Sequence, residues 1–466
     1  MNKKSLAKKL SALAIAGALQ LVAGAAGAQE HVSHGRFADV TLYRPAAEVK
    51  SFVLFLSGDG GWNQGVEGMA RALAAEGALV AGVDVPKFLA SFSGDGASCV
   101  NPDGDLENLS HYLQGYAQLP TYYAPLLVGY SSGATLAYAM LAQAGSGTFA
   151  GAVTLGFCPD LEIKAQPCHG AGLHYQARPS GKGIDIASTS KLGGPWWALH
   201  GEQDAVCDID ATRTFVGAAP EATMVSLPNV GHGYQVQRNW LPQLLETYRA
   251  AAARTKNALD APSLPGLPLV EMPTERDGDL FAVLVSGDGG WAGLDKEVAA
   301  GLVARGIPVV GLDSLRYFWK ARTPESFAAD LDQILNFYSD HWGKQRAIVI
   351  GYSQGADVLP FALNRLSPDA NAIVERSVLL APAENASFEF HLTSWVGGNS
   401  GDHPVKPEIE RLDLTRLACF YGQDENDESP CSGLDNAARV QALPGGHHFN
   451  GAYSELVSQI TAGMSW

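Results

Sequence analysis

The stretch 346–366, RAIVIGYSQGADVLPFALNRL, decides the fold of this chain. Its apolar run at 347–350 predicts a buried parallel strand. The pentapeptide GYSQG at 351–355 follows at once and leads directly into a helical pattern. A serine between two glycines at a strand-to-helix turn is typical of a nucleophile elbow, because the turn leaves no space for side chains at the flanking positions. Ser353 is therefore the predicted nucleophile.

The same pattern occurs a second time, earlier in the chain. The run LLVGYSSG at 126–133 leads into the helical sequence ATLAYAMLAQA. A second motif, SGDGGW, is also repeated, at 57–62 and at 286–291, and each copy follows an apolar run. Two motifs that recur in the same order predict a duplicated domain.

Each half alternates apolar runs with helical patterns. Such alternation indicates parallel sheets covered by helices on both faces. With the two elbows, it predicts an α/β fold of two tandem α/β-hydrolase-like domains, each with a mostly parallel sheet. The expected strands are 52–56, 79–83, 125–128, 152–155, 196–199 and 223–227 in the first half, and 280–285, 307–312, 346–350, 377–380, 416–421 and 438–443 in the second.

The N-terminus has the pattern of a secretory signal peptide. Lysines at positions 3, 4, 8 and 9 precede an apolar run at 10–22 and an Ala-Gly-Ala site at 26–28. We therefore expect an exported, soluble periplasmic protein. The predicted organisation is a signal peptide at 1–28, an N-terminal domain at 29–250, a proline-containing linker at 251–273 and a C-terminal domain at 274–466.

Charge and cysteine content narrow the class of protein further. The formal net charge of −16 disfavours a nucleic-acid partner. Six cysteines suit an oxidising compartment. Short loops favour the pairs Cys158–Cys168 and Cys419–Cys431, which leaves Cys99–Cys207 as the third predicted disulfide.

The catalytic partners of Ser353 are sought after the fifth and sixth strands, because this fold orders them serine, acid, histidine. Glu425 follows a strand-end glycine at the spacing seen in the first half, and Asp424 and Asp427 are alternatives. His447 follows a glycine after the sixth strand, whereas an ungapped alignment of the two halves favours His448. We favour Glu425 and His447.

The first half contains a corresponding set of residues. Ser131 lies in its elbow, Asp204 follows its fifth strand, and His232 follows its sixth strand after a glycine. These three residues predict a second Ser-His-acid site, although duplicated domains often lose one of their two sites.

The repeated SGDGGW loop follows the first strand of each domain, where this fold supplies one oxyanion-hole donor. It lacks the lysine of a phosphate-binding loop, so a nucleotide site is not expected. The predicted oxyanion residues are Gln354, Asp288 and Gly289 in the second half, and Ser132, Asp59 and Gly60 in the first. The candidates for substrate binding are Asp288, Trp291 and Asp357, and neither a metal nor an organic cofactor is expected.

Several of these motifs together resemble a known family. GYSQGADVLPF at 351–361, SGDGGW, FCPD at 157–160 and GGHHF at 445–449 are similar to the VirJ/AcvB family of bacterial virulence proteins, in its two-domain, AcvB-like arrangement. The resemblance implies a periplasmic serine hydrolase that cleaves the aminoacyl ester of lysyl- or alanyl-phosphatidylglycerol at the membrane surface. It also implies links to lipid homeostasis and, in some bacteria, to type IV secretion, with envelope or secretion-system proteins as partners.

Two other functions compete with this hypothesis. One is a generic secreted carboxylesterase or lipase that uses the same triad. The other is a non-catalytic periplasmic adaptor of a secretion or envelope complex, against which the two complete Ser-His-acid sets argue.

Overall fold

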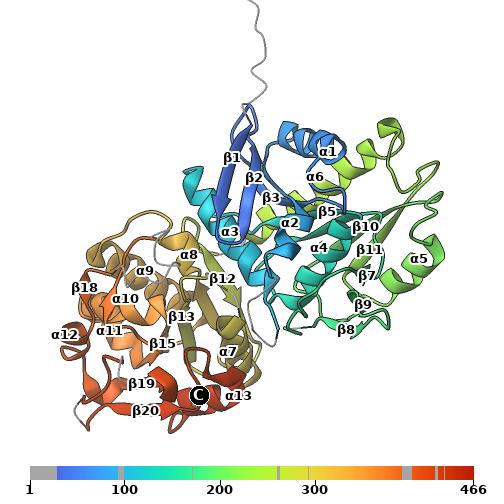
Figure 1. Cartoon of the computed structure of the whole chain (residues 1–466). Helices are drawn as coiled ribbons and strands as arrows, with labels where there is room; N and C mark the ends of the chain where they lie inside the picture. The colour runs from blue at the N-terminus through green and yellow to red at the C-terminus, as the bar shows by residue number, and fades with distance from the viewer. Residues whose placement is uncertain are drawn as a thin grey trace, which may run out of the picture.

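One β-sheet in each half of the chain organises the molecule (Figure 1). The computed structural model describes residues 29–466 except 93–98, 171, 260–262, 292, 391–400, 426–428, 435 and 466. The predicted signal peptide at 1–28 and the alternative acid Asp427 therefore lie outside the described residues.

The first sheet has eight strands in the order β1-β2-β4-β3-β5-β6-β10-β11. The run from β4 to β11 is parallel, and β1 and β2 add an antiparallel edge that the sequence did not predict. All six predicted strands of this half are confirmed. The bounds are β1 (Glu30–His34), β2 (Phe37–Tyr43), β3 (Ser51–Leu56), β4 (Ala78–Val83), β5 (Leu126–Tyr130), β6 (Gly151–Leu155), β10 (Trp196–Gly201) and β11 (Ala222–Leu227).

The second sheet repeats this topology with seven strands in the order β12-β14-β13-β15-β16-β19-β20. Only β12 is antiparallel to its neighbour, and the six predicted strands again form the parallel part. The bounds are β12 (Leu269–Met272), β13 (Leu280–Val285), β14 (Val309–Leu312), β15 (Arg346–Tyr352), β16 (Val374–Leu380), β19 (Leu417–Gly422) and β20 (Arg439–Leu443).

Helices cover both faces of each sheet. Neighbouring residues of a central strand point to opposite faces, and they pack into separate apolar cores. Leu54 and Phe55 of β3 belong to different apolar clusters, as do Val283 and Leu284 of β13. The helices of the first half are α1 (Gln64–Ala75), α2 (Val85–Ala90), α3 (Pro102–Tyr116), α4 (Ser132–Gln143), α5 (Ile209–Gly217) and α6 (Leu241–Leu259). Those of the second are α7 (Gly293–Ala304), α8 (Ser314–Tyr317), α9 (Pro324–Trp342), α10 (Gln354–Leu363), α11 (Pro368–Ile373), α12 (Lys406–Ile409) and α13 (Tyr453–Thr461).

Local sequence signals set the ends of these helices. Asn63 starts α1 by accepting a hydrogen bond from the Gly65 N–H. Thr323 and Ser326 form a capping box at the start of α9, and Gly343 ends that helix in the left-handed conformation.

Two small antiparallel sheets lie outside the main ones. The segment between β6 and β10 forms the first, with β7 (Asp160–Leu161), β8 (His174–Ala177) and β9 (Ile184–Ala187). The second pairs β17 (Asn385–Ala386) with β18 (His403–Pro404).

The disulfides differ from the predicted set at two of three pairs. Cys419–Cys431 is confirmed, but the predictions Cys158–Cys168 and Cys99–Cys207 are wrong, because the structure contains Cys99–Cys168 and Cys158–Cys207. The physical reason is the sheet order. Cys158 follows β6 and Cys207 follows β10, and these neighbouring parallel strands bring the two loops together at one edge.

The region between the two halves carries regular structure. Helix α6 runs to Leu259, and β12 joins the edge of the second sheet, so both occupy part of the stretch 251–273 for which the sequence predicted a linker. The halves also touch directly, since Trp319 Nε1 donates to the Leu119 carbonyl at 2.7 Å. No helix in the described part of the chain is long and apolar enough to cross a bilayer.

Candidate active site

Ser353 lies in a strained elbow between β15 and α10. Its backbone has φ 52° and ψ −122°, a conformation that costs a non-glycine residue free energy and is typical of functional sites. A Cβ on Gly351 would lie 2.4 Å from the Gly355 oxygen, and one on Gly355 would lie 2.1 Å from the Val285 oxygen. The two glycines are therefore required by contact with backbone, as the motif predicted.

The first half builds the same turn between β5 and α4. Ser131 has φ 55° and ψ −123°. A Cβ on Gly129 would meet the Gly133 oxygen at 2.1 Å, and one on Gly133 would meet the Leu56 oxygen at 2.3 Å. The two serines thus have the same backbone geometry.

The structure brings Ser353, His447 and Glu425 together. His447 Nε2 lies 2.9 Å from Ser353 Oγ, and His447 Nδ1 lies 2.9 Å from Glu425 Oε1. The serine follows β15, the acid follows β19 and the histidine follows β20, so three carboxyl ends of parallel strands supply the site. This is the hydrogen-bonded chain from acid to base to nucleophile that serine hydrolysis requires.

The alternative residues lie beside this chain and take other contacts. His448 Nδ1 is 2.8 Å from the Tyr352 hydroxyl, and burial together with the neighbouring His447 lowers the pKa of His448. The Asp424 backbone N–H donates to the Gly445 carbonyl at 3.2 Å, while the carboxylate that contacts His447 is that of Glu425.

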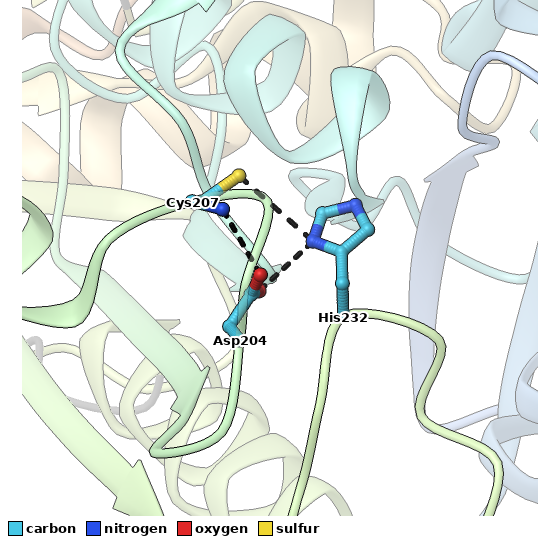
Figure 2. A group of neighbouring side chains, drawn as sticks. All are labelled: Asp204, Cys207 and His232. Atoms are coloured by element: carbon cyan, nitrogen blue, oxygen red, sulfur yellow. Dashed lines mark hydrogen bonds and ion pairs between the residues drawn. The ribbon is translucent and has the colours of Figure 1, made fainter.

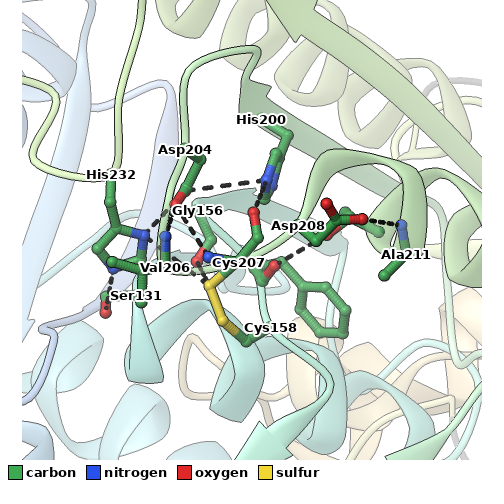
Figure 3. A network of polar contacts seen from close by, with 12 residues as sticks. Ser131, Gly156, Cys158, His200, Asp204, Val206, Cys207, Asp208, Ala211 and His232 are labelled. Carbon is green, nitrogen blue, oxygen red and sulfur yellow. Dashed lines mark hydrogen bonds and ion pairs between the residues drawn. A yellow bond between two sulfur atoms is a disulfide. The ribbon is translucent and has the colours of Figure 1, made fainter.

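The first half contains an equivalent chain of three side chains (Figure 3). Ser131 Oγ lies 3.0 Å from His232 Nε2, and His232 Nδ1 lies 2.8 Å from Asp204 Oδ2. The Asp204 side chain has no exposed surface, and its other oxygen accepts the backbone N–H groups of Val206 and Cys207. Burial raises the pKa of Asp204, but these N–H donors and His232 outweigh it, so the net pKa is lowered and the carboxylate stays ionised.

His200 is a residue of this site that the sequence did not single out. It is fully buried at the end of β10, with Nε2 2.9 Å from the Cys207 carbonyl and 3.8 Å from Asp204 Oδ2 (Figure 3). The sequence signal that could have identified His200 is its position directly after an apolar run and four residues before Asp204. In the second half, Tyr421 of β19 likewise lies four residues before the acid, Glu425.

One group of side chains in the described part of the chain has the spacing of a metal site. Ligand atoms of Asp204, Cys207 and His232 lie within 4.8 Å of one another (Figure 2). The sulfur of Cys207 is bonded to that of Cys158, so it offers no thiolate to a metal. The group is better explained as an acid–base pair with a disulfide packed beside it.

The SGDGGW loop lies against the elbow in both halves. A Cβ on Gly287 would be 3.4 Å from the Ser353 Cβ, and one on Gly58 would be 3.2 Å from the Ser131 Cβ. Ser286 Oγ fixes the loop by accepting the Ser314 N–H at 2.9 Å. The predicted oxyanion residues Asp288 and Gly289, and their counterparts Asp59 and Gly60, belong to these loops.

Gln354 and Ser132, the other predicted oxyanion residues, are the first residues of α10 and α4. Backbone N–H groups in a first helical turn have no partner within the helix, so they are free to meet a developing negative charge. Each site thus combines a helix N-terminus with a glycine-rich loop around its serine.

The predicted substrate-binding residues take different places. Asp357 is buried, and its Oδ1 accepts the Ala383 N–H at 2.6 Å, so it holds the loop after β16. Burial raises the pKa of Asp357 well above its usual value. Trp291 packs on Gly311, where a Cβ would lie 2.1 Å from the ring, and lines a cavity between the two halves.

Asp288 lies nearer to the chemistry. It is half-buried, burial raises the pKa of its carboxyl, and the nearby His447 partly opposes that shift. It is therefore the one of the three candidates that interacts electrostatically with the second triad.

A pocket lies against triad residues in each half, including Ser131 and His232 in the first half and His447 and Glu425 in the second. In the second half a cavity of about 500 Å³ is lined by Ala381, Ala383, Glu384, Tyr421, Ser429 and His447, with Glu425 at its wall. In the first half a cavity of about 660 Å³ opens on Ser131 and His232. Glu384, Tyr421 and Ser429 are pocket residues that no sequence motif marked.

An elbow serine, a histidine and an acid at the carboxyl edge of a parallel sheet define the α/β-hydrolase fold of esterases and serine hydrolases. The family model described as "Bacterial virulence protein (VirJ)" matches residues 50–149 and 279–465. The chain belongs to the VirJ family, as its motifs predicted.

Solved structures similar to this chain have esterase-type folds and low sequence identity. An esterase domain from a Rhodothermus marinus protein is 18% identical, with a TM-score of 0.31, and the match covers 47% of this chain and 92% of that one. A putative dienelactone hydrolase from Klebsiella pneumoniae is 17% identical, with a TM-score of 0.34 and coverage of 49% and 98%. An α/β serine hydrolase homologue from Coxiella burnetii is 16% identical, with a TM-score of 0.31 and coverage of 49% and 96%. No curated protein matches the chain significantly.

Proposed function

We propose that the C-terminal half is a serine esterase that releases the amino acid from lysyl- or alanyl-phosphatidylglycerol in the periplasm. The observation that carries the proposal is the hydrogen-bonded chain from Glu425 through His447 to Ser353. Glu425 and His447 of this chain line a pocket that also bears the carboxylate of Glu384. The resemblance of its motifs to the VirJ/AcvB family supplies the substrate class.

The chemistry follows from the contacts of the triad. Ser353 Oγ attacks the carbonyl carbon of the amino acid while His447 Nε2 accepts the serine proton, and Glu425 stabilises the imidazolium that results. The first N–H of α10 and the SGDGGW loop bind the oxyanion. The glycerol oxygen leaves with the proton from His447, and water then releases the amino acid from the serine by the same steps in reverse.

The ammonium group of the substrate requires a negative partner next to the reacting ester. Glu384 lines the pocket, is exposed, and precedes the small strand β17. Asp288 approaches from the opposite loop and interacts with His447. We assign the ammonium to Glu384 and Asp288, and not to Asp357, whose carboxylate is used within the fold.

A periplasmic location is supported by the predicted signal peptide and by three disulfides, which form in oxidising compartments. In that location the substrate would be presented at the membrane surface, and envelope or secretion-system proteins are the proposed partners. No organic cofactor or metal is required for the chemistry.

The test is hydrolysis of vesicles that contain lysyl- or alanyl-phosphatidylglycerol by the mature chain and its serine variants. Ser353→Ala should reduce amino-acid release by at least about 1000-fold, whereas Ser131→Ala should retain it. Full activity of Ser353→Ala would refute the proposal. Faster turnover of p-nitrophenyl esters than of either lipid at the C-terminal site would favour a generic esterase. Absence of fluorophosphonate labelling of both serines would favour an adaptor.

The role of Glu384 has a separate test with a matched control. Glu384→Gln should raise the KM for the lysyl lipid about fivefold, because an exposed ion pair contributes up to about 1 kcal/mol. The KM for a neutral p-nitrophenyl ester should not change. Glu389→Gln, at an exposed glutamate that is not among the pocket residues described, should alter neither value.

A further inference from the structure

We propose that the N-terminal half is a second, independent esterase site, and that its substrates are uncharged esters with an apolar acyl group. This proposal concerns the triad of Ser131, His232 and Asp204, and it does not depend on the substrate of the C-terminal half.

The first argument is that the site is complete. Ser131 has the strained elbow conformation, its Oγ is 3.0 Å from His232 Nε2, and the acid is held by three donors. A half that served only as a scaffold would have no need for a strained serine backbone or for a buried carboxylate aligned on a histidine. The pocket opens directly on Ser131 and His232, so a substrate can reach them.

The second argument is that the two sites are separate. The first pocket is lined by residues between Gly58 and Trp240, and the second by residues between Ala381 and His447. Among the residues that the structure describes, the two cavities have no lining residue in common. Each can therefore bind its own substrate, and removing one serine leaves the other site intact.

The third argument is the apolar character of the first pocket. Val66, Met69 and Trp240 are buried side chains in its wall. Val206 also lines it, with 69% of its surface exposed, and Val236 lies between the lining residues Gln235 and Gln237 with 46% exposed. In the described part of the chain the exposed large hydrophobic residues are these two valines and Tyr116. Exposed apolar side chains grouped at a pocket indicate that an apolar group binds there.

The fourth argument is charge. Asp59 is the one carboxylate among the described lining residues of the first pocket, and it is exposed, whereas Gln64, Gln235 and Gln237 supply neutral amides. Among its described lining residues the second pocket carries the carboxylates of Glu384 and Glu425. Amides hydrogen-bond an uncharged ester without requiring a cation, so the first pocket fits a neutral substrate better than an aminoacyl one.

The reaction needs only water as co-substrate. Ser131 Oγ forms a bond to the ester carbonyl carbon while its proton passes to His232 Nε2. The bond from that carbon to the alcohol oxygen breaks, and the alcohol takes the proton from His232. Water then attacks the acyl-serine and gives a proton to His232, which returns it to Ser131 Oγ as the acyl–serine bond breaks. One ester and one water yield one carboxylic acid and one alcohol.

The first experiment isolates the N-terminal site in the full mature chain. Ser353→Ala should still hydrolyse p-nitrophenyl butyrate, and the double variant Ser131→Ala/Ser353→Ala should lose that activity by at least about 1000-fold. Ser353→Ala should also react with a neutral fluorophosphonate at Ser131. If the single and double variants have equal activity and Ser131 is not labelled, the proposal is wrong. Because the C-terminal site is disabled in both variants, this outcome is independent of the substrate of that site.

The second experiment tests the substrate class in the Ser353→Ala background. Val206→Asp keeps the backbone N–H that donates to Asp204 but places a charge where the acyl group binds, so it should raise the KM for p-nitrophenyl butyrate about tenfold and affect kcat less than KM. The matched control, Tyr116→Asp, replaces an exposed apolar residue that lines neither pocket and should change neither value. An unchanged KM in Val206→Asp, or release of lysine from the lysyl lipid as fast as hydrolysis of the butyrate, would overturn the apolar assignment.

Discussion

The two triads have the same serine geometry, but their acids are held differently. Ser131 and Ser353 share φ and ψ within a few degrees, and each meets its histidine at about 3 Å. The Asp204 side chain is fully buried and has two backbone donors besides its histidine, whereas the Glu425 side chain is 28% exposed. A duplicated fold can therefore fix the nucleophile through backbone contacts while the loop that carries the acid varies.

Disulfides tie this variable loop in each half through different partners. Cys207 lies after Asp204 and bonds to Cys158 of the neighbouring strand end. Cys431 lies after Glu425 and bonds to Cys419 within β19, the strand before the acid. The first bond crosses between two loops at the site, and the second closes a local loop.

The largest effect is expected at the base of the second triad. His447→Ala should lower kcat/KM for the ester substrate about 10000-fold, because His447 alone of the two adjacent histidines contacts Ser353. His448→Ala removes a contact with the Tyr352 hydroxyl and should cost less than about tenfold. Steady-state kinetics of the two variants in the Ser131→Ala background measure this, and a reversed order would contradict the observed arrangement.

Replacing the acid should lower kcat by different factors in the two sites, and both losses should be smaller than that of His447→Ala. Asp204→Asn, measured on p-nitrophenyl butyrate in the Ser353→Ala background, should lower kcat about 1000-fold, since a buried amide cannot stabilise the imidazolium. Glu425→Gln, measured in the Ser131→Ala background, should lower kcat about 100-fold, because water can reach the partly exposed side chain at this position. Equal losses would show that burial of the acid makes no difference to catalysis.

Removing one disulfide at a time should affect the kinetics of one site and not those of the other. Cys158→Ser/Cys207→Ser should lower first-site kcat/KM about tenfold, because the loop that donates N–H groups to Asp204 loses its anchor. It should also lower the free energy of unfolding by about 2–4 kcal/mol. The control, Cys419→Ser/Cys431→Ser, should leave first-site kinetics unchanged. Loss of first-site activity in both variants would indicate global destabilisation.

The smallest effect concerns two acids at matching positions in equivalent helices. Asp103 and Glu325 each follow the first-position proline of α3 and α9. Burial raises the pKa of Asp103 to about 6, whereas hydrogen bonds with its own backbone, Thr323 and Arg365 lower the pKa of Glu325 despite slight desolvation. The folded state therefore favours protonated Asp103, so this contribution to stability is present near pH 4 and is lost as the pH rises through about 6.

Asp103→Asn should accordingly raise the free energy of unfolding by about 1 kcal/mol at pH 7 and flatten its dependence on pH between about 4 and 6. Glu325→Gln should leave stability unchanged or slightly lower it. Urea unfolding at a series of pH values distinguishes the two. A destabilised Asp103→Asn at pH 7 would mean that its charge at the helix N-terminus outweighs its burial.

Much of this architecture could be predicted from local sequence. The twelve parallel strands, both elbows and all six triad residues lie where apolar runs, glycines and strand order placed them. The antiparallel edge strands β1, β2 and β12 were missed, because strands outside the βα repeat have no alternating helices to mark them. The small antiparallel sheet of β7, β8 and β9, between β6 and β10, was missed for the same reason.

The sequence by itself determined which turn holds each serine, because the glycines at 129, 133, 351 and 355 are required by contacts within a few residues and with the adjoining strand. Only the tertiary structure decided the residues that face one another across loops. These include Cys207 as partner of Cys158, the choice of His447 over His448 as partner of Ser353, Ala383 as partner of Asp357, and Glu384 in the pocket. The physical reason is that a tight turn is fixed by the sterics of its own backbone, whereas contacts between loops depend on which strands are neighbours and on the path of each loop.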